Sequence, residues 1–214
     1  LFMKKNSMNN PAKYLSSVDP ILGAAISQIK IDHNRKPNKN HFRSLVESIV
    51  SQQLSVKASD TIFERFVDLF IKSGAIATAR SFPKPEQVLK MSDAKLRKVG
   101  LSGSKVKYIK DLAKKVIDKE VQLNRLHKMT DEEVIEHLIQ VKGIGRWTGE
   151  MFLMFSLARP DIFSHGDLGL RNAIQRIYKF KQSPTTKQIE KIIVKWSPHR
   201  TLASRYLWKS LDNS

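Results

Sequence analysis

The stretch "VKGIGRWTGEMFLMF" (residues 141–155) decides the fold, because it joins two helical patterns through a turn with two glycines. Before the turn, apolar residues over 134–139 recur at the 3.6-residue period of an amphipathic helix, and Thr130 begins a capping box. After the turn a second apolar helix starts at once. The sequence therefore predicts a hairpin of two helices over about residues 131–158.

Two interpretations of Gly143 and Gly145 are open on local grounds. The glycines end one helix and let the next begin. They also let backbone N–H groups at the start of the second helix approach a phosphate, which the helix dipole favours. Arg146 and Thr148 directly after the turn favour the second interpretation without removing the first.

The rest of the chain has the same helical period, with neither a convincing alternating strand nor a repeat, so we expect an all-α fold. We expect one domain over residues 1–214, in which 1–15 form a poorly ordered tail. Possible hinges are the loops near 30–40, 73–85 and 118–129. Further helices are expected over residues 21–29, 41–54, 55–73, 92–99, 106–117, 168–180, 184–196 and 198–211.

Composition limits the function classes. The formal charge of +18 in 214 residues favours a polyanionic partner, of which nucleic acid is the usual one. The absence of cysteine excludes disulfides and thiolate-held metal clusters and fits a reducing intracellular compartment. The six histidines form no metal-ligand spacing, so we expect neither a metal nor a cofactor. No apolar stretch is long enough for a membrane span, so we expect no membrane partner.

Residues 138–174, "LIQVKGIGRWTGEMFLMFSLARPDIFSHGDLGLRNAI", resemble the hairpin, loop and aspartate of the helix-hairpin-helix (HhH-GPD) DNA glycosylase superfamily. The segments at 48–59, 99–113 and 196–208 resemble that family's other segments in the expected order. The match is best with the alkylated-base branch, of the 3-methyladenine DNA glycosylase II type. This resemblance implies two helical lobes with an active-site cleft between them, and a monomer that acts on double-stranded DNA in the nucleoid or nucleus.

The resemblance also implies which carboxylate is catalytic. Asp167 precedes an amphipathic helix, and an aspartate there is most often an N-cap. Asp161 is a second local candidate that more often would be a turn residue after a proline. The family pattern selects Asp167, whose carboxylate would stabilise positive charge on the sugar as an alkylated base leaves. The cap and catalytic roles are compatible.

Other site residues follow from the same resemblance. Trp147 stands where strand-cutting relatives carry a Schiff-base lysine, which implies hydrolysis without strand cleavage. Trp147, Met151 and Phe163 would line the base pocket, although a core position is almost as plausible for Trp147 and more so for Phe163. The wedge that fills the gap left by a flipped nucleotide would come from Gln52, Gln53, Leu54 or Ser55.

Contacts to the DNA backbone would come from two places. The hairpin would supply Gly143, Gly145, Arg146 and Thr148, and a second segment would supply Ser102, Gly103 and Lys105. A departure from the family pattern is Lys142, which stands where relatives usually have proline. An alternative function is a non-catalytic relative that recognises distorted duplex. A glycosylase/lyase for oxidised bases is disfavoured by Trp147.

Overall fold

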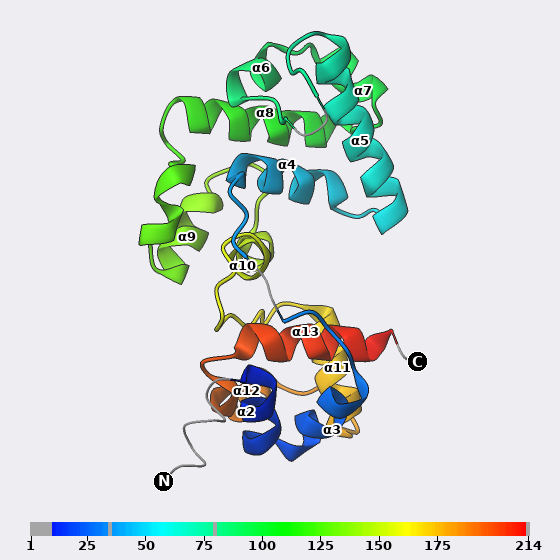
Figure 1. Cartoon of the computed structure of the whole chain (residues 1–214), viewed down its shortest axis with the longest axis vertical. Coiled ribbons are helices and arrows are strands. Elements are labelled where there is room, and N and C mark those ends of the chain that lie inside the picture. Colours follow the sequence, from blue (N-terminus) through cyan, green and yellow to red (C-terminus); the bar gives the residue numbers. More distant parts are fainter. Residues whose placement is uncertain (1–9, 34–35, 79–80, 213–214) are drawn as a thin grey trace. The chain divides into compact units, whose positions relative to one another are not determined.

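A computed structural model of the chain describes residues 10–33, 36–78 and 81–212, and these residues form helices and no strand. The expected all-α fold is therefore confirmed. In chain order the helices are α2 (Pro11–Val18), α3 (Pro20–Gln28), α4 (His41–Ser51), α5 (Val56–Lys72), α6 (Pro85–Lys90), α7 (Asp93–Lys98), α8 (Gly103–Ile117), η1 (Leu123–Lys128), α9 (Asp131–Leu138), α10 (Arg146–Phe155), α11 (Leu168–Ile177), α12 (Thr186–Ile193), η2 (Val194–Trp196) and α13 (Arg200–Leu211). Figure 1 shows the chain in this order of colours.

The chain divides into two compact units. Unit 1 comprises Leu1–Pro37 with Leu153–Ser214, and unit 2 comprises Asn38–Phe152. Helix α10 begins in unit 2 and ends in unit 1. Among the described residues, no helix has the length and apolar character needed to cross a membrane.

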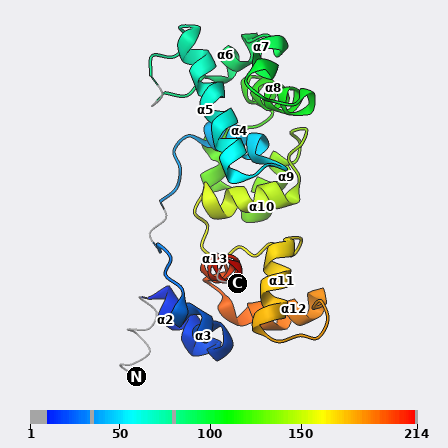
Figure 2. The ribbon, with the colours of Figure 1, turned by 90° about the vertical axis from the view of Figure 1, so that its right-hand side faces the viewer.

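In unit 2, α4 and α8 pack together. Helix α5 packs against α4, and α6 and α7 pack against α8. The core is apolar and aromatic: Phe66 and Phe70 are fully buried, and their rings lie 5.0 Å apart between centroids. Figure 2 shows α9 and the α10 ribbon side by side in the same unit. The hairpin thus belongs to the unit that also holds the α4–α5 loop.

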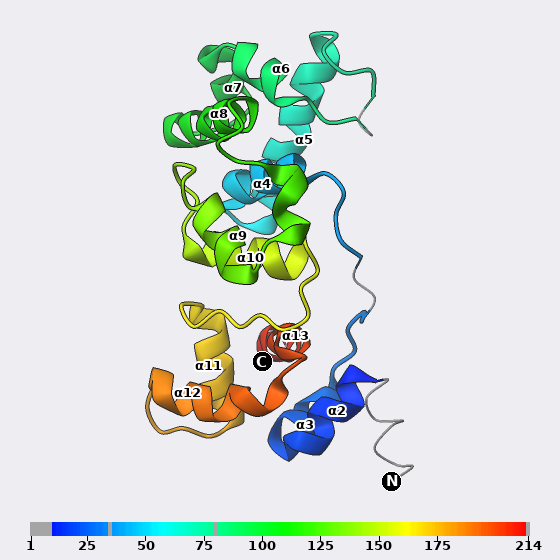
Figure 3. The same ribbon diagram turned by 90° about the vertical axis from the view of Figure 1, so that its left-hand side faces the viewer.

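In unit 1, α13 packs against α11 and against α2 and α3. Figure 3 shows α13 end-on, with α11 on one of its sides and the α2–α3 pair on the other. Fully buried Leu15, Leu22 and Trp196 join the core of this unit. Helix α2 begins at Pro11, and its Ala12 and Leu15 are buried in the core, so residues 11–15 differ from the tail expected over 1–15; residues 1–9 lie outside the described part.

Local capping explains most helix starts. Thr130 forms the expected capping box with Glu133, with Thr130 N 2.7 Å from Glu133 Oε2 and Glu133 N 3.3 Å from Thr130 Oγ1. Ser55 and Ser92 cap α5 and α7, as their positions predict. Three short elements, α2, α6 and η1, have no counterpart among the expected helices. They are only six to eight residues long, so an apolar period alone does not mark them, whereas Ser92 and Thr130 mark the starts of the equally short α7 and α9.

Candidate active site and nucleic-acid interface

The carboxylate of Asp167 is held at the start of α11. Asp167 is the N-cap residue, and its Oδ1 accepts a hydrogen bond from Leu170 N at 2.8 Å. The side chain is largely buried, because the residue is 8% exposed. The expected cap is therefore present, and it fixes the direction of the carboxylate relative to the helix.

Trp208 is a second partner that sequence reasoning missed. Its indole Nε1 donates to the same oxygen, Asp167 Oδ1, at 2.9 Å from α13. Gly169 makes this contact possible, since a Cβ there would lie 3.1 Å from Asp167 Oδ1 and 3.2 Å from Trp208 Cδ1. Nothing in the local sequence marks Trp208 as the partner of a carboxylate 41 residues away.

The backbone N–H of Leu170 and the indole N–H of Trp208 both donate to the same oxygen, Asp167 Oδ1. A carboxylate fixed by a backbone N–H and an indole N–H cannot swing freely when charge develops next to it. Such preorganisation is what makes an anion effective against a developing cation in a largely buried site. The geometry of Asp167 thus suits electrostatic stabilisation of a positively charged transition state.

Asp161, the other local candidate, has a structural role instead. Its Oδ1 accepts from Arg200 Nε at 2.8 Å and its Oδ2 accepts from Arg200 Nη2 at 2.9 Å. Ser197 Oγ also donates to Oδ2 at 2.8 Å. Burial raises the pKa of the Asp161 carboxyl, but the bonds from Arg200 and Ser197 outweigh it and hold this pKa below its ordinary value. Asp161 therefore joins the 158–163 loop to the start of α13.

The hairpin turn needs glycine at its first position for two independent reasons. Gly143 has φ +81°, and a Cβ there would lie 2.2 Å from Cδ2 of Tyr108. Gly145, in contrast, has no heavy atom within 4 Å of the place where its Cβ would be. Its carbonyl accepts from Gly149 N at 3.0 Å, so α10 starts there. The turn is packed on one side and open at the helix N-terminus, where N–H groups favour an anion.

Arg146 pairs with carboxylates of the hairpin, and the phosphate contact expected for it stays a prediction. Its guanidinium makes two 2.7 Å bonds to Glu132 of α9, and its Nε lies 3.2 Å from Glu150 Oε1. The bonds that Arg146 donates to the Glu132 carboxylate raise the pKa of Arg146. Thr148 is 5% exposed. The Arg146 side chain thus links α9 to α10 within the hairpin, and Thr148 is buried.

The second expected backbone contact is also built differently. Ser102 caps α8, accepting from Lys105 N at 3.2 Å, and Gly103 has open space around its missing Cβ. The Lys105 ammonium donates to Val50 O at 2.7 Å and to Gln52 O at 2.8 Å. Burial lowers the pKa of this ammonium. The Lys105 ammonium is thus hydrogen-bonded to backbone carbonyls of its own chain.

The four wedge candidates divide by their contacts. Gln52 Nε2 donates to Gly143 O at 2.8 Å, and Ser55 caps α5 by accepting from Ala58 N. Gln53 has φ +57°, and Leu54 is 39% exposed. Gln53 and Leu54 therefore project from the loop, while Gln52 and Ser55 hold it in place.

The three residues proposed for the base pocket lie in different units. Trp147 is 49% exposed in the first turn of α10, and Met151 lies one turn further in unit 2. Phe163 belongs to unit 1 and is buried, with its ring centroid 6.2 Å from that of Trp196. Phe163 is thus a core residue of its own unit, and a shared pocket stays a prediction.

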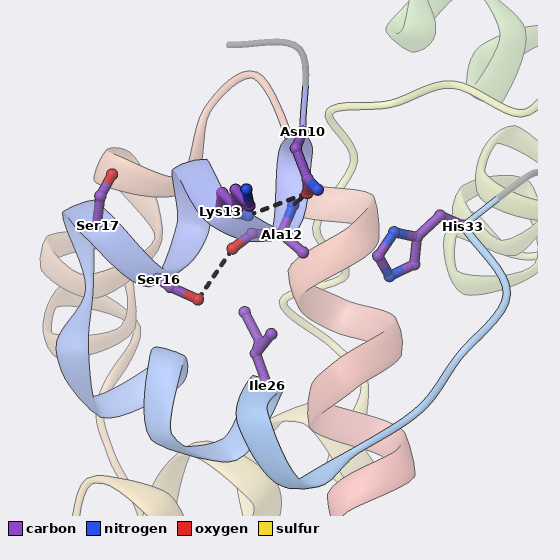
Figure 4. Close-up of a pocket in the computed structure, with 7 residues that line it drawn as sticks. All are labelled: Asn10, Ala12, Lys13, Ser16, Ser17, Ile26 and His33. Atoms are coloured by element: carbon purple, nitrogen blue, oxygen red, sulfur yellow. Dashed lines mark hydrogen bonds between the residues drawn. The ribbon is translucent and has the colours of Figure 1, made fainter. Parts of the chain in front are cut away.

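A hollow at α2 offers no alternative site. It has a volume of about 450 Å³ and is lined by Asn10, Lys13 and His33 among others. Figure 4 shows that its polar side chains serve the helix itself: Asn10 Oδ1 accepts from Ala12 N and Lys13 N, and Ser16 Oγ donates to Ala12 O. These contacts are typical of a capped helix end.

The glycine hairpin lies in one unit and the capped, buried aspartate in the other, and they are the two features on which the resemblance to the HhH-GPD glycosylases rests; comparisons with known proteins show the same family. Residues 46–199 match the family described as HhH-GPD superfamily base excision DNA repair protein. DNA-3-methyladenine glycosylase 1 of Schizosaccharomyces pombe is 35% identical over 188 residues, which cover 85% of this chain and 79% of that protein.

Solved structures give the same result. DNA-3-methyladenine glycosidase from Bacillus halodurans has a TM-score of 0.79 and 36% identity, covering 94% of this chain and 88% of the other. S. pombe 3-methyladenine DNA glycosylase (Mag1) in complex with abasic DNA has a TM-score of 0.79 and 32% identity, covering 94% and 96%. The chain belongs to the HhH-GPD superfamily of base excision DNA repair proteins.

Proposed function

We infer that this chain is a monofunctional DNA glycosylase that removes alkylated bases, such as 3-methyladenine and 7-methylguanine, by hydrolysis of the N-glycosidic bond. The observation that carries the proposal is the position of Asp167, capped by Leu170 N and fixed by the indole of Trp208. The relatives named above act on 3-methyladenine according to their names, and one was solved with abasic DNA. The two units would act as one monomeric glycosylase domain.

The chemistry follows from the charge of the lesion. Methylation of a ring nitrogen makes the base cationic and a good leaving group, so little help from a general acid is needed. As the bond to the base breaks, positive charge develops on the sugar. The carboxylate of Asp167 stabilises this charge and orients the water that attacks the sugar, in the manner of one of the two carboxylates of glycoside hydrolases.

The hairpin and the α4–α5 loop would present the nucleotide to that carboxylate. The open N-terminal turn of α10 after Gly145 binds a backbone phosphate. Flipping a nucleotide out of the duplex costs a few kcal/mol, less at a damaged base pair. Gln53 or Leu54 would fill the space that it leaves, and Trp147, half exposed, would stack on the cationic base.

The product would be an abasic site in an uncut strand. A Schiff base with the sugar requires an amine, and Trp147 stands at the place where strand-cutting relatives carry lysine. Because the chain carries a high positive charge, we also expect DNA binding to weaken steeply as salt is raised, since each neutralised phosphate releases cations.

The test is base release from DNA treated with a methylating agent, at low salt, with the released bases separated by chromatography. We expect free 3-methyladenine or 7-methylguanine, and strands that break only after heating in alkali. No release above the rate without protein would favour a non-catalytic member of the superfamily. Strand breakage without alkali would contradict the monofunctional reaction.

A further inference from the structure

Two loops of unit 2 that are far apart in the sequence are joined by a direct hydrogen bond. They are the wedge loop, defined as residues 52–55, and the hairpin turn, defined as residues 141–145. Gln52 Nε2 in the first donates to Gly143 O in the second at 2.8 Å, across 91 residues of sequence. The segment that would enter the duplex is thus connected to the segment that would bind its backbone.

Helix α8 supports both loops from one face. Lys105, Tyr108 and Asp111 follow each other at three-residue intervals, so their side chains lie on the same side of the helix. Tyr108 lies against the glycine position of the hairpin turn, and Asp111 Oδ2 accepts from Lys142 N at 2.9 Å. We call these three residues the α8 platform.

Lys105 holds the wedge-loop end of the arrangement. Its ammonium donates to Val50 O and Gln52 O, at 2.7 and 2.8 Å. These carbonyls lie at the end of α4, where a helix leaves C=O groups without partners and where a cation is favourable. The lysine therefore replaces the capping contacts that a helix end otherwise needs, and fixes the chain as it enters the wedge loop.

The wedge loop has a conformation that needs such support. Gln53 has φ +57°, a left-handed conformation that is unusual for a residue with a side chain. Leu54 in the loop is 39% exposed, and Val56, the first residue of α5 directly after the loop, is 77% exposed, so apolar groups face outward here. A strained loop that exposes apolar residues keeps this form only if its ends are held.

We propose that Lys105 and Gln52 are positioning residues, which fix the spacing between the wedge loop and the hairpin turn so that both engage one DNA duplex together. This inference rests on the proposed function. Neither side chain contacts the reacting atoms. Loss of either side chain should leave non-specific binding to DNA almost unchanged, and should reduce the preference for DNA that contains an abasic site.

The experiment compares Lys105→Met with Lys107→Met. Both remove one positive charge from α8, but Lys107 is exposed and outside the platform, so the control measures the charge effect alone. Binding is measured to duplex DNA with a tetrahydrofuran abasic analogue and to the same intact duplex. The quantity compared is the dissociation constant for the intact duplex divided by that for the abasic duplex, which is large when the abasic duplex is preferred.

We expect Lys105→Met and Gln52→Ala each to lower this ratio about tenfold. A misplaced wedge loop should weaken binding to the abasic duplex, where the loop must fit the site, more than binding to the intact duplex. Lys107→Met should weaken both duplexes alike and leave the ratio unchanged. The double variant should be little worse than either single one, because both residues act on one link. Lys105→Arg, which keeps a donor cation, should recover part of the ratio.

Two outcomes would overturn the inference: Lys105→Met with the same ratio as Lys107→Met, or fully additive effects of Lys105→Met and Gln52→Ala. If Lys105→Met does not fold, as judged by circular dichroism, the surface variant Gln52→Ala tests the same link. Wild-type protein with neither base release nor a preference for the abasic duplex would contradict the proposed function. Wild-type protein with both, beside variants with an unchanged ratio, would contradict this inference alone.

Discussion

Asp19 and Asp167 lie in the same unit and share three properties. Each is a buried N-cap residue, each accepts a backbone N–H three positions later, and each accepts an indole N–H. They differ in how the acceptors are used. Asp19 spreads its contacts over both oxygens, whereas the cap and indole bonds of Asp167 both go to Oδ1. Asp19 is bound through both oxygens to side chains of the core, and Asp167 is the carboxylate for which we propose a role in the chemistry.

The surroundings of Asp19 show what a purely structural carboxylate looks like. Its Oδ2 accepts from Tyr178 Oη at 2.5 Å and Trp196 Nε1 at 2.9 Å, and Lys195 Nζ lies 3.3 Å away. Burial raises the pKa of Asp19, but these bonds, the one from Leu22 N and the Lys195 charge bring it below its ordinary value. Asp19 is thus ionised and saturated with partners.

The largest expected effect is on stability, in Asp19→Ala. This change leaves the donors of Tyr178 and Trp196 buried without a partner, so we expect a loss of about 3 kcal/mol in the free energy of unfolding. Urea denaturation measures it. The control Asp212→Ala, at an exposed ion pair with Lys209, should change stability by less than about 0.5 kcal/mol. Equal effects of the two variants would remove the contrast.

The next effect is on rate, in Trp208→Phe. A smaller aromatic ring replaces the indole and the donor to Asp167 is lost, so we expect single-turnover base release to slow about tenfold, which is about 1.4 kcal/mol. The matched control is Trp196→Phe, which removes the indole donor to Asp19. That variant should lose stability and keep its rate. A reversal of this pattern would show that the two indoles have the opposite roles.

Low pH should reduce the difference in stability between the wild type and a variant that lacks the Asp19 carboxylate. The folded pKa of Asp19 is below its ordinary value, so its ionised form contributes stability above the ordinary pKa of about 3.9 and loses it as pH falls through the folded pKa. The gap in unfolding free energy between wild type and Asp19→Asn should therefore shrink from about pH 6 to about pH 3. A gap that is constant with pH would mean that the charge of Asp19 contributes nothing.

The smallest effect should come from Gly169→Ala. The added Cβ would crowd both Asp167 Oδ1 and the Trp208 ring, at 3.1 and 3.2 Å, so we expect base release to slow a few-fold, roughly two- to fivefold. The control Gly23→Ala has an equally tight contact, 3.1 Å from Ser16 Cα, away from Asp167. It should alter stability alone. Similar rates of base release for the two variants would show that the small size of Gly169 is not needed for the hydrogen bond between Trp208 and Asp167.

Local signals in the sequence predicted much of the fold. The capping box at Thr130, the caps at Ser55 and Ser92, and the cap at Asp167 all depend on residues within one helical turn. Such contacts can be read from the chain because their partners are close in sequence. Local reasoning could not separate Asp167 from other caps, and the family resemblance was needed for that.

Contacts between distant residues could not be predicted in the same way. Trp208 meets Asp167 across 41 residues, and Lys105 meets Gln52 across 53. These pairs depend on how helices pack, and no local pattern marks them. Arg146 illustrates the reverse case: a basic residue beside a glycine turn suggested a phosphate contact, while its bonds go to Glu132 of the preceding helix.

The most direct test of the account is the single-turnover rate of base release for Asp167→Asn, measured together with its free energy of unfolding. Asparagine keeps the cap, so stability should change by less than about 1 kcal/mol. The rate should fall by about 10²- to 10³-fold, because the charge that stabilises the transition state is lost. A variant as fast as wild type would show that Asp167 is a cap like Asp19 and that the chemistry lies elsewhere.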